Sequence, residues 1–167
     1  MKVVIDSEQF SRSLKRMTHE IIERNANLKD LVLVGIEKKG SPLALEIKKL
    51  IGLIENIDVP LEYIDISSHR DDNKKSLDVA INFDTNIENK TIILVDDVLY
   101  TGRSVRAAMD AIMDLGRPAK IELAVFVDRG HRELPIRADF VGKNIPTAKD
   151  EIIVCDFKLK QVILDKM

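Results

Sequence analysis

A short stretch from Ile92 to Ser104 constrains the fold more than any other part of this sequence. It begins with four consecutive apolar residues, Ile92 to Val95, which is the pattern of a strand buried on both faces. Two adjacent carboxylates, Asp96 and Asp97, follow the apolar run and lead into a short loop that contains Gly102. The stretch therefore predicts a central strand that ends at an acidic edge and continues into a loop.

A helix is expected directly after this loop, because apolar residues recur at helical spacing and Gly116 and Pro118 follow them. The apolar face consists of Val105, Ala108, Met109, Ile112 and Leu115. A loop that opens a helix presents unpaired backbone N–H groups and the positive end of the helix dipole, so it can bind phosphate. Thr101 and Ser104 add hydroxyl donors, and Gly102 lets the backbone approach the anion closely. The paired carboxylates suit sugar hydroxyls or a Mg²⁺ ion reached through water. The alternative is an ordinary strand, turn and helix with surface acids.

The rest of the chain repeats the alternation of strand and helix. Strands are expected at 1–5, 31–36, 61–67, 77–83, 120–127 and 138–141, and further helices at 7–25 and 41–52. Asp6 or Ser7 can cap the first helix, Ser41 and Pro42 suit the start of the second, and Gly52 can end it. This order predicts an α/β fold with a mostly parallel sheet, helices on both faces and a ligand at the carboxyl ends of the strands.

Composition limits the class of protein. A chain of 167 residues suits a single domain, 1–167, with a sizeable core. A net charge of −2 gives no global basic field that would attract nucleic acid or a membrane, although it does not exclude a local basic patch. The single cysteine, Cys155, excludes an internal disulfide and fits a reducing compartment. Without an apolar leader or a long apolar run, we expect a soluble cytoplasmic protein with no membrane partner.

The order of apolar strand, Asp-Asp and Thr-Gly-x-Ser resembles the phosphoribosyl pyrophosphate (PRPP) motif of type I phosphoribosyltransferases. Tyr100 within the motif and the segment 128–147 are similar to the PyrR family, whose members are uracil phosphoribosyltransferases and regulators of pyrimidine-operon mRNA. The likeness runs from about Ser7 to Thr147, and the sequence after Ile152 does not contribute to it. It implies the type I phosphoribosyltransferase fold, with a small hood formed by 128–147 and residues near both chain ends.

The resemblance implies a binding mode for PRPP. Asp96 and Asp97 would face the ribose and act in catalysis, and Mg²⁺ would be held mainly by PRPP, without a direct protein ligand. The 5′-phosphate would lie in the loop formed by Val98, Leu99, Tyr100, Thr101, Gly102, Arg103 and Ser104. Pyrophosphate would lie against Lys38, Lys39 and Gly40. Members of the family often have arginine where Lys39 stands, and lysine lacks its bidentate fork. Taken alone, these lysines would be a polar turn.

A polar segment, 68–75, lies between two expected strands and resembles the family's catalytic loop. The resemblance implies a catalytic role for Arg70 in this segment. Closure of such a loop would keep water from capturing a reactive ribosyl cation. An ordinary polar hairpin tip is the alternative.

Tyr100 bears on the choice of base. Purine enzymes that resemble this motif place an aspartate at the matching position, where it faces purine N7, and tyrosine with a pKa near 10 is a poor substitute. The resemblance therefore implies uracil as the acceptor, and a purine-type phosphoribosyltransferase is the alternative. The base would be bound largely by backbone groups of two segments that include Val127, Arg129, Phe140, Val141 and Lys143.

Two clusters of basic residues remain. The first helix carries Arg12, Lys15, Arg16 and His19 opposite its apolar face, and the segment 128–147 carries His131, Arg132 and Arg137 beside Arg129. A solvated helix face explains the first cluster equally well. The family resemblance implies that both clusters bind a pyrimidine-operon mRNA leader, with UMP or other uridine nucleotides as effectors. A homo-oligomer is expected, and the alternative function is an RNA-binding regulator with vestigial transferase activity.

Overall fold

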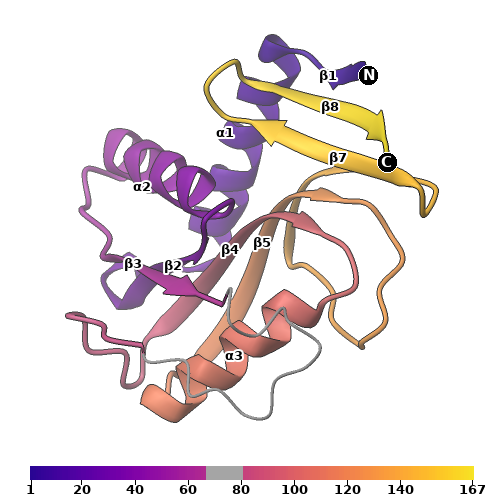
Figure 1. Cartoon of the computed structure of the whole chain (residues 1–167). Helices are drawn as coiled ribbons and strands as arrows, with labels where there is room; N and C mark the ends of the chain where they lie inside the picture. The colour runs from indigo at the N-terminus through magenta and orange to yellow at the C-terminus, as the bar shows by residue number, and fades with distance from the viewer. Residues whose placement is uncertain (67–80) are drawn as a thin grey trace.

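The computed structural model describes residues 1–66 and 81–167. Within these residues, five parallel strands form the central sheet in the order β3-β2-β4-β5-β6 (Figure 1). The strands are β2 (Leu31–Glu37), β3 (Leu61–Asp65), β4 (Thr91–Leu99), β5 (Lys120–Asp128) and β6 (Phe140–Asn144). The expected α/β fold with a mostly parallel sheet is confirmed, and β4, which carries the acidic pair, is its middle strand.

Helices cover both faces of the sheet. They are α1 (Ser7–Arg24), α2 (Ser41–Glu55) and α3 (Arg103–Leu115), and a 3₁₀ turn, Leu28–Asp30, precedes β2. In Figure 1, α1 and α2 lie on one side of the sheet and α3 lies on the other. Because side chains alternate along a strand, Ile93 packs with α1 and α2 while its neighbour Leu94 packs with α3. Two apolar layers therefore hold β4 from both sides.

A second, antiparallel sheet joins the two ends of the chain. Its order is β1-β8-β7, from β1 (Lys2–Ile5), β7 (Glu151–Asp156) and β8 (Gln161–Lys166). In Figure 1 both termini lie beside this sheet, so residues near the two chain ends form the expected hood. The expectation that all of 128–147 belongs to the hood is wrong for β6. Phe140 is buried and pairs with Ala124, which makes β6 the edge strand of the central sheet.

Several element ends differ from the sequence-based expectation. β4 continues through Leu99, because Asp96 still pairs with Val125 of β5. The N-cap of α2 is Gly40 instead of Ser41, and the helix passes Gly52 and ends at Glu55. Residues 81–83 are not a strand, and the rest of that expected strand lies outside the described residues.

The start of α1 follows the sequence. Asp6 is its N-cap and accepts a hydrogen bond from the Gln9 backbone N–H, while the Gln9 side chain accepts one from the Asp6 N–H. This reciprocal capping box fixes the direction in which the chain leaves β1. No helix within the described residues is both long and apolar enough to cross a membrane.

Candidate active site

A cavity of about 260 Å³ lies at the carboxyl end of β4. Its walls come from four parts of the chain: the turn after β2, the stretch from β4 to the first turn of α3, the end of β5, and β7. The lining residues are Lys39, Asp96, Asp97, Val98, Leu99, Tyr100, Thr101, Gly102, Ser104, Val105, Arg129, Ile152 and Ile153. Most of the residues expected to bind PRPP therefore meet around one cavity, and it lies where parallel sheets bind their ligands.

The loop between β4 and α3 has the geometry of an anion site. Gly102 is the N-cap of α3 with φ of 92°, a conformation in which other residues are strained. It has no side-chain cap, so the helix start offers backbone N–H groups to a ligand. Ser104 lines the cavity. Arg103 does not line it, since its Nε lies 3.0 Å from Glu133 Oε1 on the surface.

The two carboxylates are held by their own backbone. Asp96 Oδ1 accepts from the Asp97 N–H at 2.9 Å, and Asp97 Oδ1 accepts from the Val98 N–H at 2.8 Å. Both residues are buried and both line the cavity. Fixed carboxylates at this place can accept from sugar hydroxyls and stabilise positive charge that develops nearby.

The turn after β2 contacts β4 closely. A Cβ built on Gly40 would lie 2.9 Å from the Asp96 Cα, so only glycine fits there. The Glu37–Lys38 peptide bond is cis. Both lysines are exposed, but only Lys39 lines the cavity. Of the two lysines expected at the pyrophosphate, Lys39 is thus the one beside the acids.

Arg129 links the end of β5 to the phosphate loop. Its guanidinium lies 4.1 Å from the centre of the Tyr100 ring, and its backbone N–H donates to the Leu99 carbonyl at 3.1 Å. Its Nε donates to Thr147 Oγ1 at 2.9 Å and its Nη2 to the Ala148 carbonyl at 3.0 Å. Arg129 is therefore a fixed, buried cation in the cavity wall.

The other residues expected at the base are less close to the cavity. Val127 and Phe140 are buried in the core, where the Arg24 guanidinium lies over the Phe140 ring. Lys143 is exposed, and Val141 lines a different hollow. The structure brings Arg129 alone of this group to the cavity that holds the acids.

That second hollow has a volume of about 630 Å³ and is cationic. It is lined by Asp128, Gly130, His131, Arg132, Arg137, Ala138, Val141 and Asn144. All three basic residues expected in this segment therefore surround one depression. The Val141 carbonyl at its edge also accepts a hydrogen bond from Arg16 of α1, at 3.2 Å. The two basic clusters expected from the sequence thus meet at β6.

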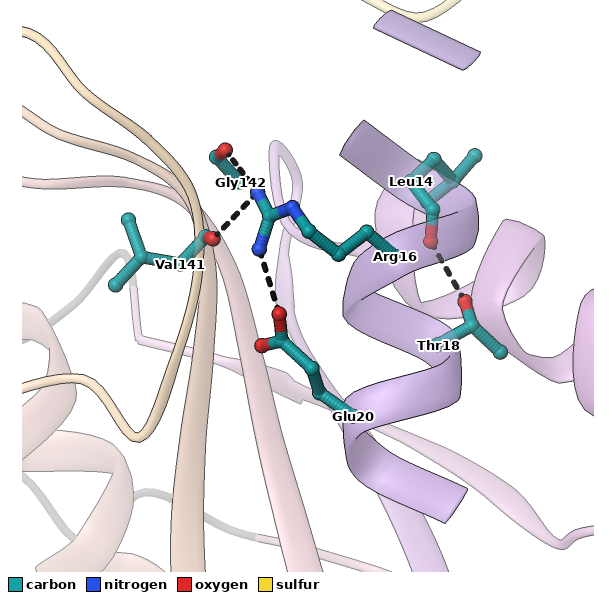
Figure 2. Close-up of polar contacts among 6 residues, drawn as sticks. All are labelled: Leu14, Arg16, Thr18, Glu20, Val141 and Gly142. Atoms are coloured by element: carbon teal, nitrogen blue, oxygen red, sulfur yellow. Dashed lines mark hydrogen bonds and ion pairs between the residues drawn. The ribbon is translucent and has the colours of Figure 1, made fainter. Parts of the chain in front are cut away.

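Figure 2 shows how Arg16 lies. Its Nη2 donates to the carbonyl oxygens of Val141 and Gly142, the latter at 2.5 Å, and its Nη1 lies 2.8 Å from Glu20 Oε1. Arg16 therefore ties α1 to β6 and is not a free surface cation. Its neighbours on the stripe, Arg12, Lys15 and His19, are exposed. Of these, Arg12 pairs with Glu8 at 3.4 Å.

One wall of the site, β7, was not expected from the sequence. Ile152 and Ile153 line the cavity, and Cys155 follows on the same strand. Burial raises the pKa of the Cys155 thiol, the Asp97 and Asp96 carboxylates raise it further, and Lys39 lowers it. The thiol is therefore held in its protonated form. The signal for this strand was the run of apolar residues before Cys155, matched by a second run around Ile163 after a polar turn.

Metal binding can be judged from the donors present. Within the described residues, no three histidine, cysteine or carboxylate side chains gather around one point. Two fixed carboxylates at the cavity fit an ion that takes most of its ligands from a polyphosphate and from water, as Mg²⁺ commonly does. Arg70 and the segment 68–75 lie outside the described residues, so the catalytic role expected for Arg70 stays a prediction.

Comparisons with known proteins agree with this geometry. Residues 4–161 match the family model described as phosphoribosyl transferase domain. A protein of Fusobacterium nucleatum named bifunctional protein PyrR is 54% identical over 157 residues, which cover 92% of this chain and 89% of that protein. A protein of the same name from Roseiflexus is 51% identical, covering 91% of this chain and 85% of its own length.

Solved structures show the same fold. The hypoxanthine phosphoribosyltransferase of Trypanosoma cruzi superposes with a TM-score of 0.80 at 19% identity, covering 99% of this chain and 97% of the other. A hypoxanthine-guanine phosphoribosyltransferase of Bacillus anthracis gives a TM-score of 0.75 at 24% identity, and the superposition covers 92% of this chain and 85% of the other. At this identity the likeness shows the type I phosphoribosyltransferase fold and does not bear on the base.

Proposed function

This chain belongs to the phosphoribosyl transferase family and, within it, to the PyrR proteins, and from that membership we propose that it transfers the phosphoribosyl group of PRPP to uracil. The products are UMP and pyrophosphate. The observation that carries the proposal is the cavity in which two fixed carboxylates, Asp96 and Asp97, stand beside the uncapped start of α3. Such a site matches a ligand that is both a sugar and a phosphate ester.

PRPP would lie with its 5′-phosphate on the Tyr100–Ser104 loop and its ribose hydroxyls on the two carboxylates. Its pyrophosphate would lie against Lys39 and the Gly40 turn. Mg²⁺, when bound, would neutralise the pyrophosphate and ease its departure; Asp96 and Asp97 are the residues that would face it, through water or the ribose oxygens. No covalent attachment to the protein is required.

The carboxylates have a second role in the reaction. As the bond from ribose C1 to the pyrophosphate oxygen lengthens, positive charge grows on the ribose ring. Asp96 and Asp97 are buried and already oriented, so they stabilise this charge without reorganising. Uracil N1 then attacks C1, while the bonding pair leaves with pyrophosphate. The segment 68–75 resembles the catalytic loop of the family, and we propose that Arg70 acts in the reaction from this segment.

Tyr100 favours uracil over a purine. The Arg129 guanidinium covers the tyrosine ring, and His131 meets the ring edge with a centroid separation of 5.8 Å. The ring is therefore held as a wall and offers no carboxylate to purine N7. Of the residues expected at the base, Arg129 lines this cavity and would therefore be the one that contacts the base.

The test is a direct assay of nucleotide formation from PRPP and Mg²⁺ with uracil, hypoxanthine, guanine and orotate. We expect turnover with uracil and at least about a hundredfold lower kcat/KM with the purines, since a site built for one set of polar groups rejects others strongly. Comparable turnover on hypoxanthine would show a purine-type enzyme instead. No turnover with any base, together with tight uridine nucleotide binding, would favour a regulator with vestigial activity.

A second function is favoured by the joined basic clusters. Lys15 and His19 of α1 are exposed on a helix that Arg16 ties to Val141, at the edge of the hollow formed by His131, Arg132 and Arg137. We propose that this composite surface binds the leader hairpin of pyrimidine-operon mRNA in the cytoplasm, with UMP or another uridine nucleotide in the active site as effector. Phosphate contacts would supply affinity and unpaired loop bases the specificity. A homo-oligomer would extend the surface.

A further inference from the structure

We propose that Arg129 binds the pyrimidine base in its anionic form and that Thr147 is the positioning residue that holds Arg129 for this task. The inference rests on the proposed transfer to uracil and adds to it the charge state of the acceptor. It also assigns a role to Thr147, the last residue of the segment 128–147, for which the family resemblance implied no role of its own.

Thr147 holds the arginine at several points. Its Oγ1 accepts from Arg129 Nε at 2.9 Å, and its own N–H donates to the Arg129 carbonyl at 3.3 Å. Its carbonyl also lies 2.5 Å from His131 Nε2. Because the guanidinium is planar, bonds at Nε and Nη2 together with the Tyr100 ring fix its plane. Thr147 thus supplies the Nε contact among the three that orient the cation in the cavity wall.

Within the described residues Arg129 forms no ion pair with a carboxylate, although Asp96 and Asp97 line the same cavity. Arg129 is only 7% exposed, yet its side-chain partners are a hydroxyl, a carbonyl and an aromatic ring, and none is a carboxylate. Asp128 beside it in sequence instead accepts from the Gly130 N–H at 3.0 Å. A buried cation without an anion is costly unless a ligand supplies the charge. The cavity that it lines is the one assigned to the base and PRPP.

Uracil meets this requirement when it loses its N1 proton. The charge of the anion spreads to the two carbonyl oxygens of the base, which can accept hydrogen bonds from the guanidinium N–H groups. In the step proposed, the N1 proton passes to solvent, the N1 electron pair forms the bond to ribose C1, and the C1–O pair leaves with pyrophosphate. The overall reaction therefore releases one proton for each UMP formed. Arg129 makes N1 the better nucleophile by stabilising the anion before attack.

The experiment compares uracil with 5-fluorouracil, whose electron-withdrawing fluorine makes N1 more acidic. We expect Arg129→Gln to lower kcat/KM for uracil about a hundredfold. The factor by which it lowers kcat/KM for 5-fluorouracil should be at least about five times smaller. The KM for PRPP should stay within about threefold of wild type. Thr147→Val should show the same difference between the two bases, with a smaller loss of kcat/KM, and Thr147→Ser should be close to wild type. The double variant Arg129→Gln with Thr147→Val should lose no more kcat/KM than Arg129→Gln alone. Arg117→Gln is the control, because Arg117 is exposed and lies just before β5, at the opposite end of the strand from the cavity.

A binding measurement gives the same information without turnover. Calorimetry of 5-fluorouracil binding in two buffers of different ionisation enthalpy counts the protons released. Wild type should release close to one proton per base bound, and Arg129→Gln clearly fewer. Arg117→Gln should release as many protons as wild type, because its side chain is exposed and outside the cavity.

The two proposals fail separately. Equal losses on both bases, or proton release unchanged in Arg129→Gln, would overturn the inference while uracil turnover by wild type still stands. Absence of uracil turnover in wild type would overturn the proposed reaction, and proton release on binding would then decide the inference alone.

Discussion

The backbone of Gly40 packs against the backbone of Asp96, so that a Cβ on Gly40 would lie 2.9 Å from the Asp96 Cα. The turn proposed for pyrophosphate and the strand that carries the acids are therefore in direct contact. Any side chain at position 40 must push these two parts of the site apart. The spacing between Lys39 and the carboxylates thus depends on a glycine.

Gly40→Ala should therefore impair the reaction. A displacement of about 1 Å in a site that positions two reactants can cost up to about a hundredfold in rate, so we expect a fall in kcat/KM for PRPP of at least about tenfold. Steady-state kinetics would measure it. Gly52→Ala in the same helix is the control, since its nearest neighbour is 3.7 Å away. It should retain activity and gain about 0.5–1 kcal/mol in stability. Normal kinetics in Gly40→Ala would contradict the assignment of this turn.

Changing Asp96 and Asp97 together to Asn removes two charges and keeps the shape of both side chains. The amide oxygens can still accept from the Asp97 and Val98 N–H groups, so folding should survive. We expect kcat to fall by about a hundredfold or more, because fixed charge at the ribose is lost. Asp110→Asn on the exposed side of α3 should leave kcat unchanged. Turnover within about threefold of wild type in the double variant would refute the role given to the acids.

The ion pair between Arg24 and Glu122 should be important for stability. Arg24 Nε lies 2.7 Å from Glu122 Oε2, and the glutamate is 3% exposed. Arg24→Met leaves a buried carboxylate without its cation, which should cost about 3 kcal/mol in the free energy of unfolding measured with urea. Adding Glu122→Met should recover most of this loss. Arg106→Met, which removes only a surface pair with Asp110, should cost less than about 1 kcal/mol.

Because the pKa of the Cys155 thiol is raised, we expect the folded protein to lose stability at alkaline pH. Because burial and two carboxylates raise the pKa of the folded thiol above its unfolded value of about 8.5, the unfolded chain releases this proton first as the pH rises. The contribution of Cys155 is thus complete below about pH 8 and declines above it. The free energy of unfolding of wild type should fall relative to Cys155→Ala between pH 8 and 10.

Iodoacetamide at pH 8 should label the native thiol at least about tenfold more slowly than the unfolded one. Rapid labelling of the native protein would contradict this environment.

Reversing charge on the composite basic surface should weaken RNA binding without affecting the transferase reaction. Lys15→Glu with Arg132→Glu is the informative pair, because both side chains are exposed while Arg16 is committed to β6. We expect at least about a tenfold weaker Kd for a pyrimidine-operon leader hairpin in filter binding with UMP at physiological salt. Uracil turnover should persist. Lys49→Glu on α2 is the matched control. Equal affinity of wild type for that hairpin and for unrelated RNA would exclude specific regulation.

Local sequence was enough to predict the centre of the molecule. The apolar run 92–95 had to be a buried strand, Gly102 had to lie at a turn, and periodic apolar residues had to form α3. These features depend on contacts between residues close in sequence, which the printed order already contains. The PRPP motif could be recognised for the same reason, since one strand, one loop and one helix start build it.

Other parts of the site depended on contacts that local sequence does not record. Whether Arg16 faces solvent or β6 is decided by how α1 packs on the sheet, with Met17 close to Gly142. Ile153 reaches the cavity only because β7 pairs with β8, which pairs in turn with β1 at the other end of the chain.

The sequence by itself determined the alternation of strands and helices, the phosphate loop and the acidic pair, because each follows from hydrophobic period, chain stiffness or side-chain chemistry over a few residues. Only the tertiary structure decided which charges are free. It commits Arg16 to the carbonyls of β6 and Arg24 to Glu122, and among the residues that the structure describes it gives Arg129, in the cavity wall, no carboxylate as an ion-pair partner. The physical reason is that burial and pairing are properties of the space around a side chain, and that space is filled by residues distant in sequence.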